Sequence, residues 1–388
     1  MNNNITNFLG IKDIQIISFN EFENSLVFEI QTSPKNQSCP CCGSLISAVH
    51  DYRTQRIKDL PYRGKTVILL LKKRRYRCRQ CSKRFIEKYG FLPRYHHMTQ
   101  RVYEFILRAL RSNRSMKSVA QEFSVSSTTV SRVFDIVSYS LHKLPSVLAI
   151  DEFKGNSGGE KYHAILTDPG RKKLLDIIPS REKLTLSGYF RAFTRREHVK
   201  LVVMDMWEPY KDLAKYYFPN AILVIDKYHY IRQVYWALDR VRKRVQKRFI
   251  DEKRIYFKRS RKLFFARFKR LSDEKKQQLQ VMLSQHADLL NAWQLKEMFC
   301  EFKDCADYEI AKKLLKQWIL TAQEISLPEF SDCVTAFLNW FGCILNSKLT
   351  PLTNAFTEGM NNKIKVLKRN AYGFQNFERF RNRILHLA

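Results

Sequence analysis

The chain has 388 residues, of which 45% are hydrophobic, and its 69 Lys and Arg against 37 Asp and Glu give a formal net charge of +32. This length predicts two or three domains with cores of their own. The large positive charge argues against a small-molecule enzyme and favours nucleic acid as the partner over a membrane surface. We find no signal peptide pattern and no stretch of roughly 18 apolar residues, so we expect a cytoplasmic, nucleoid-associated protein without a membrane contact.

In residues 1–35, weak alternation of apolar and polar side chains predicts short strands. A cluster of cysteines follows these strands. Within residues 36–90, two Cys-x-x-Cys knuckles each aim two thiolates at one point, and a strand between them completes the pattern of a zinc ribbon. We predict that a structural Zn²⁺ is held by Cys39, Cys42, Cys78 and Cys81. Cys41 is a spare thiol, and His50 is an alternative ligand. The cations beside the second knuckle are expected to contact the DNA backbone, among them Arg74, Arg75 and Arg77.

Residues 99–143 have apolar side chains at helical spacing. Between Met116 and Phe134, a small residue at Ala120 suits a close helix crossing, and Ser126 or Ser127 can cap a second helix. This pattern predicts a helix-turn-helix, and the alternative is an ordinary helical hairpin. The second helix would present to a major groove the side chains of Thr128, Thr129 and Arg132.

Strands and helices alternate through residues 146–226, in the order strand, strand, strand, helix, strand, helix, strand. By analogy, this is the order of a ribonuclease H-like core. Residues 227–350 are then predicted to be helical throughout, and residues 351–388 to complete the core. The predicted fold is therefore an α/β ribonuclease H-like catalytic core with a large all-α insertion, preceded by a zinc ribbon and a helix-turn-helix.

Three acidic residues occupy the positions where this fold would bind metal. Asp151 and Asp205 each end an apolar strand, and Glu358 opens a basic helix near the C-terminus. If the two strands are parallel neighbours, both aspartates reach one edge of the sheet, and a helix packed there can add Glu358. Such a triad suits Mg²⁺ or Mn²⁺ and phosphodiester chemistry. Asp226 also ends a strand and is an alternative second ligand, with His229 and Asn361 as auxiliary groups.

The predicted insertion begins with a dense run of cations that few acidic neighbours oppose. A helix with charge of one sign is costly without an anion, so we predict that this segment follows DNA. The residues expected to make these contacts are Arg242, Lys243, Arg244, Lys247 and Arg248. Lys365 and Lys368, about two and three helical turns beyond Glu358, are expected to contact the DNA backbone as well.

Four stretches resemble a known family: Ala149–Phe153, Val203–Tyr210, Asp226–His229 and Thr353–Asn361. They are similar to bacterial insertion-sequence transposases with DDE chemistry, of the zinc-ribbon "ISL-three" group, which is distantly related to Mutator-type transposases. The resemblance implies a catalytic triad of Asp151, Asp205 and Glu358. In Mutator-like relatives a Cys-x-x-His pair follows the second Asp, whereas here Asp226 replaces the Cys, which leaves the role of Asp226 open.

The resemblance further implies binding of terminal inverted repeats, Mg²⁺-dependent strand cleavage and strand transfer into target DNA, and assembly of a homodimer or higher multimer on double-stranded DNA. Two other functions fit the same modules. One is a catalytically inactive transposase-derived regulator that only binds DNA, and the other is a ribonuclease H-like nuclease or resolvase that cuts without joining.

Overall fold

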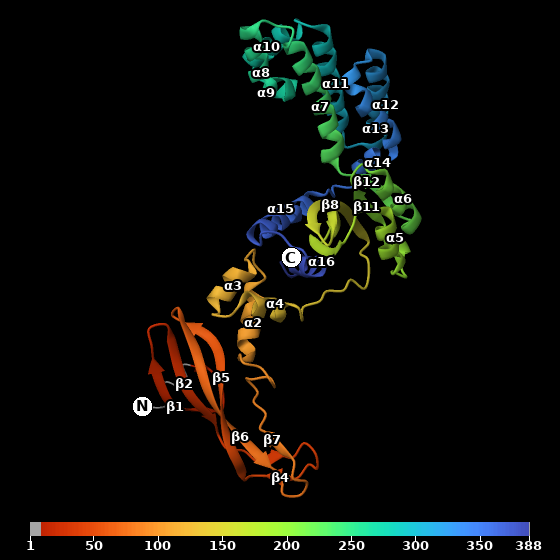
Figure 1. Ribbon diagram of the computed structural model, residues 1–388. Helices are drawn as coiled ribbons and strands as arrows, with labels where there is room; N and C mark the ends of the chain where they lie inside the picture. Colours follow the sequence, from red (N-terminus) through yellow and green to blue (C-terminus); the bar gives the residue numbers. More distant parts are fainter. Residues whose placement is uncertain (1–8, 388) are drawn as a thin grey trace. The chain divides into compact units, whose positions relative to one another are not determined.

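The computed structural model describes residues 9–387, which form two compact units (Figure 1). The first unit holds residues 9–139, 364–374 and 378–387, and the second holds residues 140–363 and 375–377. No described helix combines the length and the apolarity that crossing a bilayer requires.

The first unit contains a five-stranded sheet in the order β1-β2-β6-β5, with β7 also paired to β6. Its strands are β1 (Ile14–Glu21), β2 (Ser25–Thr32), β5 (Val49–Tyr62), β6 (Lys65–Arg77) and β7 (Arg84–Ile86). The parallel register of β2 and β6 places Phe28 beside Leu69 and Ile30 beside Leu71, and all four side chains are buried. The N-terminal strands that the sequence separated from the ribbon therefore share one sheet and one core with it.

Three helices follow this sheet: α2 (Gln100–Ala109), α3 (Met116–Glu122) and α4 (Ser127–Phe134). The hydroxyl of Ser126 accepts a hydrogen bond from the backbone N–H of Thr129 (3.1 Å), so Ser126 is the cap of α4. Ala120 on α3 and Val130 on α4 are both buried where the two helices pack. The predicted helix-turn-helix is present.

The C-terminal helix α16 (Phe377–Leu387) belongs mainly to the first unit, whereas the sequence assigned it to the catalytic core. The reason is Arg383, whose side chain is 1% exposed. Its guanidinium donates to the backbone carbonyls of Leu110, Ser112 and Arg114, which follow α2 and have no helical partner there. A cation near the end of a helix is also favoured by the helix dipole.

The second unit is built on a sheet in the order β10-β9-β8-β11-β12. β8 (Val147–Ser157), β9 (Glu160–Asp168) and β10 (Lys173–Ile178) are antiparallel neighbours, whereas β11 (Leu201–Met204) and β12 (Ile222–Ile225) run parallel to β8. The intervening helices are α5 (Lys183–Arg191) and α6 (Glu208–Tyr217). Every strand and helix that the sequence predicts between 146 and 226 is present.

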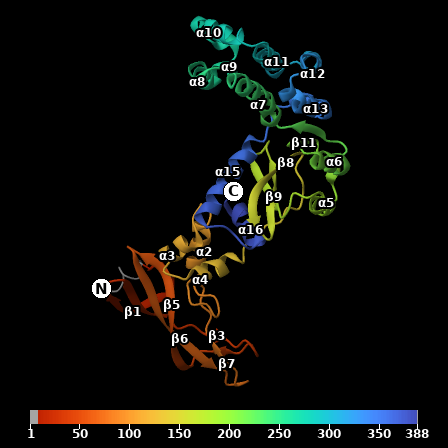
Figure 2. The same ribbon diagram turned by 45° about the horizontal axis from the view of Figure 1, so that its top comes forward.

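Both views place α5 and α6 on one side of this sheet and α15 (Ala355–Asn370) on the other (Figure 1 and Figure 2). Between β12 and α15 the chain is helical, as predicted, and α7 and α11 pack together within this region. Its helices are α7 (Lys227–Gln246), α8 (Asp251–Arg259), α9 (Arg261–Phe265), α10 (Asp273–Leu283), α11 (Ala287–Asp304), α12 (Tyr308–Ile325), α13 (Ser331–Asn339) and α14 (Phe341–Leu345).

Candidate active site and metal centre

Three aspartates form a row on one face of the second sheet. The parallel register pairs Ile150 with Met204 and Met204 with Ile225, so Asp151, Asp205 and Asp226 are the next residues on three adjacent strands. Asp205 and Asp226 directly follow β11 and β12, whereas Asp151 lies within β8, which continues to Ser157. Side chains alternate between the faces of a strand. The aspartates therefore lie on the face that carries Ala149, Val203 and Val224, away from the main core that contains Ile150, Met204 and Ile225. The sequence predicted this meeting of Asp151 and Asp205.

The residue after Asp151 confirms the alternation. Glu152 lies on the opposite face, where its carboxylate pairs with Arg181 (2.5 Å) and accepts from the hydroxyl of Tyr210 on α6 (3.2 Å). Glu152 therefore lies away from the three aspartates and is not positioned to share a cation with them.

The beginning of α15 packs over the aspartate row. Thr357 and Thr167 on β9 join their hydroxyls at 2.7 Å. The amide of Asn361 donates to Asp151 Oδ2 (3.0 Å), and the amide of Asn354 donates to Asp205 Oδ1 (3.3 Å). Glu358 lies four residues after Asn354 and three before Asn361, so it falls on the same helix face as these two residues. Its charge acts on Asp226.

Asp226 and His229 belong to the same cluster of polar side chains. Asp226, which is 5% exposed, accepts a hydrogen bond from the backbone N–H of Asn354 (3.3 Å), and His229 Nε2 lies 3.1 Å from Asp205 Oδ1. Asn354 thus connects Asp205 and Asp226. Asn354 is not among the predicted site residues, because an asparagine before a helix is common and no local pattern marks this one.

The charges in this cluster repel one another. Burial, and then the charge of Asp205, raise the pKa of Asp151 to about 7. Burial raises the pKa of Asp226, and the charges of Asp205 and Glu358 add to that rise. Burial lowers the pKa of His229, but the hydrogen bond and charge of Asp205 outweigh it, so the net pKa of His229 is raised. Such a group of carboxylates is stabilised by positive charge.

The polar atoms of the cluster fit a hard divalent cation. The side-chain oxygens of Asn354 and Asn361 are buried, and neither has a hydrogen-bond partner among residues 9–387. Because these oxygens point away from donors and lie beside carboxylates, they match the oxygen ligands and ordered water that Mg²⁺ prefers. The carboxylate oxygens are too far apart for three of them to share one cation in this structure. Among the described residues, only the cysteine cluster has three or more possible ligand atoms all within 4.8 Å of one another.

The raised pKa of Asp151 gives a testable pH dependence. The pKa of this carboxyl is near 4 in the unfolded chain and about 7 in the folded one. The contribution of Asp151 to the free energy of unfolding is therefore complete below pH 4 and is lost as pH rises towards 7. In EDTA, we expect Asp151→Asn to match the wild type at pH 4 and to exceed its unfolding free energy by up to about 4 kcal/mol at pH 8. Denaturant titrations at both pH values measure this, and a difference independent of pH contradicts it.

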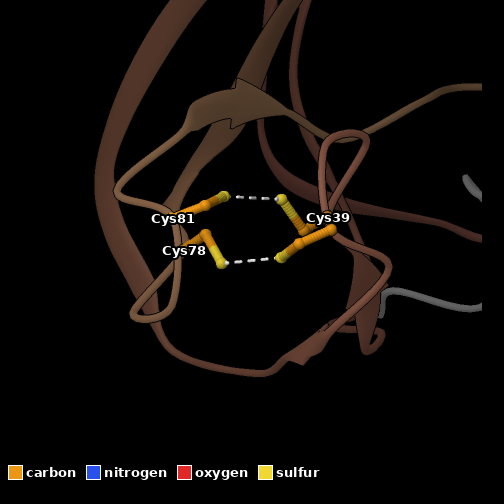
Figure 3. Close-up of side chains that lie close together, drawn as sticks. Cys39, Cys78 and Cys81 are labelled. Carbon is orange, nitrogen blue, oxygen red and sulfur yellow. Dashed lines mark hydrogen bonds between the residues drawn. The ribbon is translucent and has the colours of Figure 1, made fainter.

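The four predicted zinc ligands come together in the first unit. The Sγ atoms of Cys39 and Cys81 lie 3.5 Å apart, as do those of Cys42 and Cys78, and all four lie within 4.8 Å of one another (Figure 3). A tetrahedral site with Zn–S bonds of roughly 2.3 Å requires sulfur atoms at nearly this separation. Cys41 is exposed and outside the cluster, and the ribbon β3 (Gln37–Ser38) and β4 (Leu45–Ile46) holds the first knuckle. The cysteine set predicted from the sequence supports structural zinc.

The predicted DNA contacts divide into exposed and buried groups. On α4, Thr128 and Arg132 are exposed and Thr129 is half-buried. Arg77, Lys243, Lys247, Arg248 and Lys365 are exposed, and Lys368 is half-buried. Several of these cations have partners within the fold: Arg75 pairs with Asp51, Lys243 pairs with Asp239 (2.8 Å), and Arg248 donates to His286 (2.9 Å).

Three predicted DNA-contacting arginines instead hold the protein together. Arg74 is 3% exposed and pairs with the buried Glu87, and Arg242 is 3% exposed and pairs with Asp239 (2.7 Å). Arg244 joins two acidic residues that lie far away in the sequence, Asp288 and Glu329. A buried guanidinium that is bonded to carboxylates is not accessible to a phosphate. We therefore no longer expect DNA contacts from Arg74 or Arg242, whereas Arg244 is half-buried and remains partly accessible.

Comparison with known proteins adds to this geometry. A model of the DDE transposase of the ISL3 group, described as "Transposase", matches residues 148–384. The chain belongs to the ISL3 transposase family. Two further models match the first unit: "zinc-finger of transposase IS204/IS1001/IS1096/IS1165" at residues 35–81, and "Helix-turn-helix domain of transposase family ISL3" at residues 87–135. This membership implies a DNA-binding, nucleotidyl-transfer enzyme.

Two curated proteins are similar to this ISL3 transposase family member. The transposase for insertion sequence element IS1001 of Bordetella parapertussis is 27% identical over 372 residues, which cover 92% of this chain and 90% of that protein. A protein of Lactococcus lactis named as an ATP-dependent protease is 40% identical over 67 residues, or 17% of this chain and 22% of that protein. The first similarity extends over all the modules described above.

Proposed function

We propose that this ISL3 family member binds the terminal inverted repeats of an insertion sequence and catalyses Mg²⁺-dependent strand cleavage and strand transfer, with Asp151, Asp205 and Glu358 as its catalytic carboxylates. The row of aspartates on one sheet face, covered by the helix that carries Glu358, is the observation that carries the proposal. The sequence similarity to the IS1001 transposase supports it.

We further assign the second unit to the ribonuclease H-like folds. Three antiparallel strands, β8 to β10, are followed by two strands that return parallel to β8 on its other side, each after a helix. This order supports the assignment because it places Asp151 on β8 beside Asp205 at the end of β11, where a metal-dependent nuclease of this fold needs its first two carboxylates.

Residues of the cluster have distinct roles in the proposed site. Asp151 and Asp205 hold the cation, Glu358 contributes from α15, and Asn361 and Asn354 fix the orientation of the two aspartates by their amide hydrogen bonds. Two Mg²⁺ ions, when bound, would activate the attacking oxygen and stabilise the leaving oxygen of an in-line displacement. His229 Nε2 contacts Asp205 Oδ1, the same oxygen that the amide of Asn354 contacts, and helps to orient this carboxylate.

DNA would be held by the exposed cations and the second helix of the helix-turn-helix. Thr128, Thr129 and Arg132 suit a major groove, and the exposed or half-buried lysines and arginines suit phosphates; these are Arg77, Lys243, Lys247, Arg248, Lys365 and Lys368. Arg75 and Arg244 remain candidates as well, because their side chains are partly exposed despite their ion pairs. The protein would act as a homodimer or higher multimer on paired ends, in association with the nucleoid.

The test uses a labelled duplex that carries one end of the element with its flanking DNA. With Mg²⁺ we expect nicking at the element boundary and joining of the released end to a target plasmid, and with EDTA neither product. Asp151→Ala should bind the duplex as the wild type does and form no product. Binding without metal-dependent cleavage would identify a regulator, and cleavage without joining would identify a nuclease, so either result contradicts the proposal.

A further inference from the structure

One face of α7 carries an alternating series of aromatic and cationic side chains. Tyr228, Arg232 and Trp236 are spaced four residues apart, so they stack along the helix. The Arg232 guanidinium carbon lies 5.1 Å from the centroid of the Tyr228 ring and 4.4 Å from that of Trp236. Both contacts are within the range of cation–π attraction. We call these three residues the α7 ladder.

The α7 ladder is exposed where large aromatic side chains are usually covered. Tyr228 is 53% exposed and Trp236 is 48% exposed. Within the described residues 9–387, Arg232 has no ion pair or hydrogen bond, and its Nε is buried between the rings without a partner. The arginines further along the same helix differ, because Arg240, Arg242 and Arg244 all bond to acceptors of the fold. The ladder therefore presents two ring faces and a set of unused donors to its surroundings.

The α7 ladder begins at the proposed active site. α7 starts directly after Asp226, and the ring of Tyr228 lies 6.0 Å from that of His229, which contacts Asp205. The charge of Arg232 acts on His229. Gln233 directly follows Arg232, and its amide nitrogen contacts the sulfur of Met206, the residue after Asp205. The side-chain oxygen of Gln233 is buried and has no partner in the described part of the chain. The ladder thus continues from the carboxylates along α7.

We propose that the α7 ladder binds unpaired nucleotides of a DNA strand beside the cleavage site, with bases stacked on Tyr228 and Trp236 and a phosphate held by Arg232. Aromatic faces next to a free guanidinium are the chemistry that single-stranded nucleic acid requires. Bases inside a duplex already stack on one another, so the rings would select a strand whose end has opened. This inference rests on the proposed function, and it names the form of the substrate that the site accepts.

The charge of the chain favours this occupant over a second copy of the protein. Each copy carries a formal net charge of +32, and the ladder itself adds an uncompensated cation, so two such faces repel each other. A DNA strand instead supplies both the anion for Arg232 and the ring partners for the aromatics. Association between copies through this face is therefore an outcome that the experiment must distinguish.

The test measures binding of the full-length protein in EDTA, so it does not depend on cleavage. We expect Trp236→Ala and Tyr228→Ala each to weaken binding of a short fluorescein-labelled oligo(dT) strand by roughly tenfold and to leave binding of a duplex of the same length within about twofold. Tyr216→Ala is the matched control, because Tyr216 is an aromatic residue of the second unit that is 79% exposed on α6, and it should change neither affinity.

A second variant separates stacking from folding. Trp236→Phe keeps an aromatic face, so it should keep the oligo(dT) affinity within about threefold, yet it should lose most of the quenching of tryptophan emission that the strand causes. Trp318 and Trp340 are buried and respond little to a bound strand.

Unchanged oligo(dT) affinity in the alanine variants, or an equal loss for strand and duplex, would overturn the proposal. Loss of self-association in sedimentation with unchanged strand binding would assign the face to a second copy and also overturn it. Because no metal is present, these outcomes are independent of whether the protein cleaves DNA.

Discussion

Asp205→Asn is expected to reduce cleavage of the element end by at least roughly a thousandfold, whereas Asp226→Asn is expected to reduce it by less than about tenfold. β11 lies directly beside β8, so Asp205 is the strand neighbour of Asp151, and Asp226 is two strands away. Strands are separated by roughly 4.8 Å, so one cation reaches Asp151 and Asp205 together far more readily than Asp151 and Asp226. Loss of a ligand that stabilises transition-state charge costs about 4 kcal/mol, which corresponds to the thousandfold effect.

The expected tolerance at Asp226 follows from its contacts. Its Oδ1 accepts a hydrogen bond from the backbone of Asn354, and an asparagine oxygen at the same position can accept it as well. Burial raises the pKa of Asp226, so the neutral amide resembles a form that the site already favours. Single-turnover cleavage with saturating Mg²⁺ measures both variants, and binding to the uncut duplex serves as the control for folding. A severe loss in Asp226→Asn with a mild one in Asp205→Asn would exchange the two roles.

Replacing Cys78 with Ala is expected to release the metal and unfold the zinc ribbon. Around the cysteines the core is small: β3 and β4 have two residues each, and the buried apolar contacts are those of Ile46 and Tyr76. A core of this size cannot offset the loss of a structural zinc ion, which contributes about 10–16 kcal/mol of apparent binding free energy in small zinc modules. The result should be one zinc lost per chain and rapid proteolysis between β3 and β7.

Cys41→Ser is the matched control for this loss. Cys41 lies in the same knuckle but is exposed and outside the cluster of four thiols, so the variant should keep one zinc per chain and the protease resistance of the wild type. Elemental analysis after dialysis and limited proteolysis measure both properties. Zinc retained in Cys78→Ala but lost in Cys41→Ser would show that the ligand set is different.

Spacing in the sequence was enough to predict features that depend on near neighbours. The two knuckles, the turn before α4 and the apolar strand segments before Asp151 and Asp205 each follow from local patterns, and the structure contains all of them. Only the end of the first strand differs, because β8 continues past Asp151 to Ser157. The packing of α15 against the aspartates was also predicted, because parallel neighbouring strands place their aspartates together where one helix can cover them.

Local sequence patterns could not predict contacts between residues that lie far apart in the chain. The basic run on α7 looked unopposed because Glu329 and Asp288, which pair with Arg244, lie 85 and 44 residues away. Arg383 bonds to carbonyls 269 to 273 residues earlier, and nothing in its own segment indicates such a partner. Asn354 was missed for a related reason, since an asparagine before a helix is ordinary until two strand-end aspartates lie against it.

The late position of α15 and α16 in the chain has a consequence for synthesis on the ribosome. Asn354, Glu358 and Asn361 complete the aspartate row, and Arg383 completes the packing after α2, yet all four are translated after more than three hundred residues that depend on them. Neither unit can therefore complete its fold until α15 and α16 have been synthesised. A polypeptide released early from an interrupted gene would lack both Glu358, the proposed third catalytic carboxylate, and the helix that supports the helix-turn-helix. We therefore expect it to compete poorly with intact copies for DNA ends.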